Sequence, residues 1–306
     1  MTDCQASNME FVYENVKMVD SDALARASNG TILHTGTPPL DEILSPDYLA
    51  SPKNVQERQK AARGGGLVPG ILHVLAGPQH LLSRVLMRLA VMAQLPPVDG
   101  GAGAARVFYV ELNNSFDPYL VSQVAMERSL NPASVLERID IARGFNWDQA
   151  VEIVGKALPA KVVSRLVVLV SGLTTFMDPS DAASFEGLRE MVGGLKRCQQ
   201  AAPVYLVATC PVADGSTYKP RGGHMLYHHA GAIVVVNGPR ETRSGSKLTE
   251  WVLVRHVAFP ERVLQCWDHA AAEKKAARRL AGRTRKGDLS TFRTLDDFTG
   301  RPRGGD

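Results

Sequence analysis

Five short apolar runs alternate with helix-length segments in this 306-residue chain, and this alternation constrains its fold more than any other feature. Continuous stretches of valine, isoleucine and leucine favour strands that are buried on both faces, as in a parallel sheet between two layers of helices. The pattern therefore predicts an α/β domain with a mainly parallel sheet flanked by helices. The expected strands are 71–75, 106–110, 166–170, 204–208 and 232–236, and the expected helices are 83–94, 118–128, 147–158 and 186–199.

Two later apolar runs extend this pattern. Residues 251–256 (WVLVRH) and 263–267 (VLQCW) are separated by a short turn that contains Pro260, so we expect a C-terminal antiparallel hairpin that extends the sheet. The folded domain is expected to span residues 31–268. Within it, residues 45–66 are polar, with proline at one end and glycine at the other, which predicts an inserted loop with about one helical turn.

The composition is that of a soluble globular protein, with 44% hydrophobic and 22% charged residues. No apolar stretch is long enough to span a membrane, and residues 1–11 lack the basic and apolar regions of a secretion signal. We therefore expect an intracellular protein without a membrane partner. The cysteines lack the spacing of metal ligands, so we expect free thiols and predict no metal site. They are Cys4, Cys198, Cys210 and Cys266.

The net charge of +4 is concentrated at the C-terminus. Residues 269–306 contain ten Lys or Arg and five Asp or Glu, and their composition predicts a basic tail that is largely disordered. Such a tail fits a nuclear-import signal, non-specific contact with nucleic-acid phosphates, or a solvated helix. Its candidate DNA-binding cations are Lys274, Lys275, Arg278, Arg279, Arg283, Arg285 and Lys286.

Several motifs occur in an order that resembles one family. They are TGTPPLDEIL at 35–44, GILHVLAG at 70–77, VFYVELNNSFDP at 107–118 and NPASVLERIDIARGFNWDQ at 131–149. In this order they resemble the RecA/RadA recombinase superfamily, in particular the archaeal and eukaryotic strand-exchange recombinases and their paralogues. The resemblance covers residues 31–268 and implies a RecA-like ATPase core whose subunits stack head to tail, so that a neighbour completes each ATP site.

Residues 1–30 are expected to form an N-terminal extension without the helix-hairpin-helix domain of this family. The family's Phe-x-x-Ala anchor, which docks on a neighbouring subunit, would fall near residues 17–20 and is absent. We therefore do not expect filament formation by the usual route.

The phosphate loop of the family is altered. In the pattern G-x-x-x-x-G-K-[ST], glycines let the backbone wrap the phosphates, lysine neutralises their charge and the hydroxyl binds Mg²⁺. Gly77 keeps the first glycine, and counting forward places Leu82, Ser83 and Arg84 at the last three positions. Alignment on the following helix instead places Leu81, Leu82 and Ser83 there. Either register removes the lysine and puts leucine where phosphate charge would need a partner.

Other catalytic positions implied by the resemblance are also replaced. Val170 stands where the family has the aspartate that holds the Mg²⁺ water, and Asn113 stands where it has the glutamate that activates the attacking water. Pro211 replaces the amide of a phosphate sensor. Because an ATPase needs positioning, metal and a water-orienting group together, we predict a pseudo-ATPase with no catalytic residue and no ATP or Mg²⁺ cofactor. The alternative is an ATPase of the same family that binds or hydrolyses ATP through atypical contacts.

The resemblance also implies two loops that contact DNA. The second corresponds to residues 211–223, where Tyr218, Lys219 and Arg221 are candidates for stacking and phosphate contact, although a solvated loop fits equally well. The first corresponds to residues 178–187, which are acidic and lack the family's arginine.

Taken together, the pattern and the resemblance predict a non-catalytic recombinase paralogue. Such a protein would act as an accessory or mediator subunit in homologous recombination and DNA repair, in a hetero-oligomer with recombinase or paralogue subunits, and single-stranded DNA is a candidate second partner. In a eukaryote its location would be the nucleus. A scaffold unrelated to DNA is the third interpretation.

Overall fold

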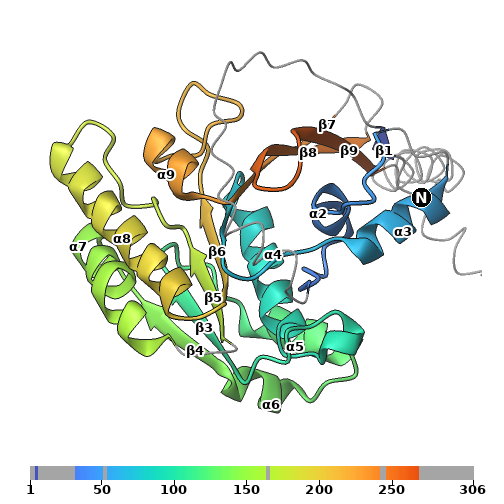
Figure 1. Ribbon diagram of the computed structural model, residues 1–306, viewed down its shortest axis with the longest axis horizontal. Coiled ribbons are helices and arrows are strands. Elements are labelled where there is room, and N and C mark those ends of the chain that lie inside the picture. The colour runs from blue at the N-terminus through green and yellow to red at the C-terminus, as the bar shows by residue number, and fades with distance from the viewer. Residues whose placement is uncertain (1–3, 6–31, 51–53, 163–165, 242–245, 269–306) are drawn as a thin grey trace, which may run out of the picture.

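One nine-stranded sheet organises the computed structural model, which describes residues 4–5, 32–50, 54–162, 166–241 and 246–268 (Figure 1). Its order is β1-β9-β8-β7-β2-β6-β5-β3-β4. The strands from β7 through β2, β6, β5 and β3 to β4 run parallel, whereas β7, β8, β9 and β1 pair antiparallel. The bounds are β1 Cys4–Gln5, β2 Leu72–Ala76, β3 Arg106–Glu111, β4 Ile139–Arg143, β5 Leu166–Ser171, β6 Tyr205–Cys210, β7 Ala232–Glu241, β8 Lys247–His256 and β9 Arg262–Asp268.

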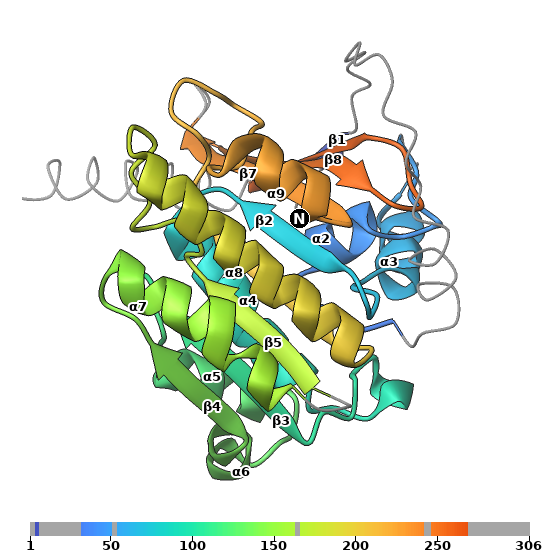
Figure 2. The same ribbon diagram turned by 60° about the vertical axis from the view of Figure 1, so that its left-hand side comes forward.

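Helices cover both faces of this sheet, and Figure 2 shows α7, α8 and α9 together over one of them. The opposite face packs against α2, α4, α5 and α6. The α-helices are α2 Pro38–Ile43, α3 Val55–Gly64, α4 Gln79–Met92, α5 Pro118–Glu127, α6 Pro132–Glu137, α7 Trp147–Val151, α8 Ala182–Ala201 and α9 Gly223–His229. Short helical turns add Pro97–Asp99 and Pro159–Lys161 (3-10) and Glu152–Ala157 (π).

The central strands alternate between the two helical layers, as the apolar runs predict. In β5, Leu169 joins the core under α4 and α5, whereas Val168 and Val170 join the core under α8. All three are fully buried. The predicted α/β class, the parallel sheet and the C-terminal antiparallel hairpin, formed by β8 and β9, are therefore confirmed.

The expectation of an inserted loop at 45–66 is wrong for residues 55–64, which form the ten-residue helix α3. Asn54 caps this helix, since its side chain accepts a hydrogen bond from the Glu57 amide at 2.9 Å. The residues before α3 are held against β9 by contacts with Arg262. Arg262 donates hydrogen bonds to the carbonyls of Ile43 and Ser45, and its guanidinium lies 4.8 Å from the centre of the Tyr48 ring.

Two strands are absent from the sequence-based prediction. Strand β4 is short and carries Asp140 and Arg143 between apolar residues, so it lacks the continuous apolar run that marks the other parallel strands. Strand β1 lies within the predicted N-terminal extension and pairs with β9, where Cys4 is opposite Cys266. The rest of residues 1–30 and the basic tail at 269–306 lie outside the described residues, so the predictions for them stay predictions.

Two helices begin four residues earlier in the structure than the sequence pattern predicts. Helix α4 starts at Gln79 rather than at residue 83, and α8 starts at Ala182 rather than at residue 186. The side chain of Asp181 caps α8 by accepting hydrogen bonds from the Ala183 and Ser184 amides. No helix in the described part of the chain is long and apolar enough to cross a membrane.

His73 is a buried polar group in the middle of the sheet, on β2. The geometry fits a neutral imidazole, because Nδ1 donates to the Leu206 carbonyl at 3.3 Å and Nε2 accepts from the Val68 amide at 3.4 Å. Burial lowers the pKa of His73 to about 4, and the hydrogen bond to Leu206 opposes this shift. Protonation would leave an uncompensated charge inside the core.

We therefore expect His73 to contribute stability that depends on pH. The folded state favours the neutral ring, so this contribution is fully present above the unfolded pKa of about 6.5 and is lost as the pH falls toward about 4. The stability advantage of the wild type over His73→Gln should shrink by about 3 kcal/mol between roughly pH 7 and pH 4. Urea unfolding at several pH values measures this difference.

The test uses the difference in unfolding free energy between wild type and His73→Gln, because other groups also make stability depend on pH. Burial raises the pKa of Asp41 to about 7, for example, which gives that carboxyl the opposite pH dependence. The exposed His80, replaced by glutamine, controls for the substitution itself. A wild-type advantage that stays constant from neutral to acidic pH would contradict the assignment.

Candidate functional site

The connection between β2 and α4 consists of two residues, Gly77 and Pro78. Gly77 has a φ of +154° and its amide donates to the Cys210 carbonyl at 3.1 Å. A Cβ atom built on Gly77 would lie 2.6 Å from the Val236 carbonyl oxygen. Glycine is therefore required here by the close approach of β7, and the connection is too short to form a loop that wraps a phosphate.

The residues that follow belong to the first turns of α4. The amides of Leu81 and Leu82 donate to the Pro78 carbonyl at 3.0 and 3.1 Å, so the helix itself uses them. Leu82 is 1% exposed and lies in the core, against which Leu81 also packs. Ser83 is buried and Arg84 is exposed. Both sequence registers thus place core leucine side chains at the aligned phosphate-loop positions.

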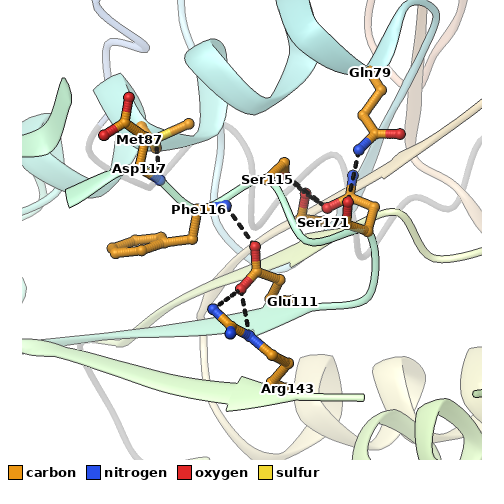
Figure 3. Close-up of polar contacts among 9 residues, drawn as sticks. Gln79, Met87, Glu111, Ser115, Phe116, Asp117, Arg143 and Ser171 are labelled. Carbon is orange, nitrogen blue, oxygen red and sulfur yellow. Dashed lines mark hydrogen bonds and ion pairs between the residues drawn. The ribbon is translucent and has the colours of Figure 1, made fainter. Parts of the chain in front are cut away.

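A hydrogen-bond network lies at the carboxyl edge of the sheet, beside the connection between β2 and α4 (Figure 3). The side-chain oxygen of Asn113 accepts hydrogen bonds from Ser115 at 2.7 Å and from Ser171 at 2.8 Å. The side-chain amide of Gln79 donates to the Asn113 carbonyl at 2.7 Å. These contacts join the start of α4, the β3–α5 loop and the end of β5, and we call them the edge network.

An ion pair between a buried glutamate and an exposed arginine supports the same loop. The Glu111 side chain is fully buried at the end of β3, and the Arg143 guanidinium at the end of β4 lies 2.6 Å from its carboxylate. The other carboxylate oxygen accepts a hydrogen bond from the Phe116 amide (Figure 3). Because both carboxylate oxygens are engaged, this pair ties the β3–α5 loop to β4 rather than presenting a charge to a ligand.

Sequence reasoning identified Asn113 but missed its partners. Glu111 could have been noted in the sequence, because it is a carboxylate directly after an apolar strand run. Its role could not be predicted, because it depends on Arg143 at the end of the unpredicted strand β4. Gln79, Ser115 and Ser171 are common polar residues whose meeting depends on the parallel order of β2, β5 and β3.

Of the two remaining aligned positions, Val170 lies in the core, whereas Pro211 directly follows β6 and is half-buried. Val170 is 0% exposed and pairs with Val110 on β3 and Ala208 on β6. Cys210 ends β6, and burial raises the pKa of its thiol to about 12. This thiol is therefore neutral and unreactive at ordinary pH.

A pocket of about 540 Å³ lies beside the edge network, between α4 and the start of α5. Ser83 contributes a buried hydroxyl that has no hydrogen-bond partner among the described residues. Asp117 also lines the pocket, but its side chain caps α5 by accepting from the Tyr119 and Leu120 amides. The lining residues are Gln79, His80, Ser83, Arg84, Met87, Ser115, Asp117 and Leu120.

The loop at 211–223 is folded back on itself. Val212 and Pro220 form an antiparallel bridge, and the Ala213 amide donates to the Lys219 carbonyl at 2.8 Å. Arg221 donates to both carboxylate oxygens of Asp214 at 3.1 Å.

The three DNA candidates of this loop therefore differ in their surroundings. The Tyr218 hydroxyl lies 3.5 Å from the Glu250 carboxylate, and the Arg221 charge is paired with Asp214. Lys219 is exposed. The structure thus directs two of the three side chains toward intramolecular partners. The tail candidates Lys274, Lys275, Arg278, Arg279, Arg283, Arg285 and Lys286 lie outside the described residues.

Comparison with known proteins identifies related sequences. The Rad51 family model matches residues 64–180, which extend from the end of α3 to the segment after β5. DNA repair protein RAD51 of Mycosarcoma maydis is 30% identical over 185 residues, which cover 55% of this chain and 54% of the relative. DNA repair protein RAD51 homolog 1 of Arabidopsis thaliana is 26% identical over 181 residues, which cover 54% and 53%. The chain spans about half the length of these curated relatives.

The close approach at Gly77 yields a test of its structural role. We expect Gly77→Ala to lower the free energy of unfolding by about 2–4 kcal/mol, because the methyl group meets the Val236 carbonyl and the positive φ is strained. Gly215→Ala is the matched control, since Gly215 also has a positive φ but no atom lies within 4 Å of its added Cβ. Gly215→Ala should lower the free energy of unfolding by about 1 kcal/mol. Equal losses in urea unfolding would show that the contact with β7 does not matter.

Proposed function

We propose that this chain, which is related to the RecA/Rad51-family recombinases, is a non-catalytic accessory subunit in homologous recombination and DNA repair. Both curated relatives carry the name of DNA repair proteins. The observation that carries the proposal is the edge network, in which Gln79 and Ser171 each donate a hydrogen bond to Asn113. They do so at the edge where, by the resemblance, a nucleotide would be held.

The residues at this edge do not fit a nucleoside triphosphate with its magnesium ion. The two-residue connection supplies no loop of amides, residues 77–84 contain no lysine, and Val170 offers no carboxylate to a metal. Leu82 is fixed in the core, so the missing groups cannot be supplied by a shift of this helix turn without exposing apolar surface. We therefore assign no hydrolytic step and no catalytic residue to the chain.

The alternative is atypical ATP binding, and one observation favours it. The pocket beside α4 contains the unpartnered Ser83 hydroxyl and is bordered by Arg84, near the N-terminus of a fourteen-residue helix. A helix N-terminus attracts anions. Against this alternative, the Asp117 carboxylate lies on the opposite wall and would repel phosphate.

Calorimetry with ATP separates the two functions. We expect no saturable heat up to millimolar ATP, with or without Mg²⁺, whereas an active Rad51-family recombinase in the same buffer gives the positive control. A micromolar affinity would contradict the proposal. If binding occurs and Ser83→Ala or Arg84→Ala abolishes it, the pocket beside α4 is the site and the alternative function holds.

The partner surface that we propose is the outer edge of β4, at the opposite end of the sheet from the β8–β9 hairpin (Figure 1). Within the described residues β4 pairs with β3 alone, so its other backbone groups are available to an added strand. Two large apolar side chains accompany this edge, since Ile141 is 45% exposed and Phe145 is 68% exposed. A recombinase or paralogue subunit could bury both. Single-stranded DNA as a second partner and a nuclear location remain part of the proposal.

Charge placed on this edge should break the contact. We expect Ile141→Arg and Phe145→Asp each to weaken binding to a Rad51-family recombinase or paralogue from the same source by at least about tenfold, because each buries a charge at an apolar interface. Val98→Asp is the matched control, since Val98 is 91% exposed and lies on the Pro97–Asp99 turn. Surface plasmon resonance with purified proteins measures the affinities.

Because all three positions are exposed, the variants should keep the wild-type thermal stability. Equal binding by all variants would overturn the assignment of the edge. A wild-type protein that stays monomeric and binds none of these partners would overturn the accessory function.

A further inference from the structure

Helix α9 places two histidines on one face. His224 and His228 are four residues apart in Gly223–His229, and both are exposed. Their ring centroids lie 6.1 Å apart and the ring planes differ by 24°. Residues at this spacing stand one above the other on successive turns of a helix. Figure 2 shows α9 beside α8, on the outside of the sheet.

We propose that His224 and His228 form a binding site for a late first-row divalent cation, such as Ni²⁺, Cu²⁺ or Zn²⁺. Imidazole nitrogen is a preferred ligand of these ions, with metal–nitrogen distances of about 2.0–2.1 Å for zinc. The i, i+4 spacing on a helix is the one by which two histidines bind a single zinc ion. Rotation of the exposed rings brings one nitrogen of each to a common ion.

The site has two protein ligands. No group of three or more His, Cys, Asp or Glu side chains with metal-binding geometry occurs in the described part of the chain. The other coordination positions therefore belong to water, and the site is an open one rather than a closed structural centre.

His229 is adjacent in sequence but does not belong to the pair. It lies five residues from His224 and so projects from a different side of the helix. Its different position on the same helix makes His229 the matched control for the two ligands.

A bound cation would add a restraint to the short helix α9. Helix α9 is seven residues long, and its N-cap residue, Gly222, provides no side-chain hydrogen bond. A metal held by successive turns links both ends of this helix. Because α9 directly follows the 211–222 loop, the cation would also further stabilise the folded loop that carries Lys219. This inference is independent of the proposed accessory function.

Titration of the full chain without an affinity tag tests the site. We expect isothermal calorimetry with Ni²⁺ and with Zn²⁺ to show a saturable one-to-one event. His224→Ala and His228→Ala should each weaken it by about tenfold or more, since each removes one of two protein ligands, and His229→Ala should leave it within about twofold. Binding should also weaken at acidic pH, because a coordinated imidazole must be neutral.

Hydrogen exchange supplies a second measurement that does not depend on heat. Saturating Zn²⁺ should slow amide exchange in residues 211–229 of the wild type and of His229→Ala, but not of the two ligand variants. The proposal is overturned if no one-to-one binding is seen, if the double variant His224→Ala/His228→Ala binds as well as the wild type, or if His229→Ala weakens binding as much as the ligand variants do.

Discussion

The structure depends on burial of its central strands from both sides. Strands β2, β6, β5 and β3 lie in the middle of the sheet, with one helical layer on each face. Leu169 faces one layer and Val170 faces the other, and neither is exposed. Since apolar burial contributes about 25 cal/mol per Å², two-sided coverage stabilises these strands most. Parallel strands joined by helical crossovers provide this coverage, and they bring every strand end of one kind to the same edge.

The chemistry of the site follows from that edge. Three segments that are far apart in the sequence converge there, and each brings a polar group that forms a hydrogen bond with another of them. Gln79 and Ser171 donate to Asn113, and Glu111 is paired with Arg143 and the Phe116 amide. A charged ligand binds less favourably to an edge whose polar groups already have internal partners than to an open loop whose backbone amides lack partners. This balance is the physical basis for proposing contacts with other subunits instead of turnover.

Surfaces available to other molecules lie away from the closed edge. The outer side of β4 combines unpaired strand backbone with Ile141 and Phe145, and α9 displays His224 and His228 on the helical layer beside α8. The two surfaces suit different chemistries, because one offers apolar contact with strand pairing and the other offers nitrogen ligands. Neither requires movement of the core, so both are compatible with a rigid α/β domain.

The sequence by itself determined the class of fold, because strand and helix signals are local. Continuous apolar runs mark the five central parallel strands and the later pair marks the hairpin, which is why these elements could be predicted. Helix α3 escaped prediction because its residues are mostly polar, and strand β4 escaped it because Asp140 interrupts its short apolar run. The predicted replacements at Leu82, Asn113 and Val170 were likewise drawn from the sequence, since they rest only on position within a motif, and they stay predictions.

Only the tertiary structure decided what those residues do. Ser171 bonds to Asn113 from 58 positions away, and Arg262 holds the Ile43 carbonyl from 219 positions away. No local pattern encodes such contacts, because they exist only after the strand order has brought distant segments together. For the same reason the sequence could show that Gly77 is retained, whereas only the approach of β7 shows that packing requires a glycine there.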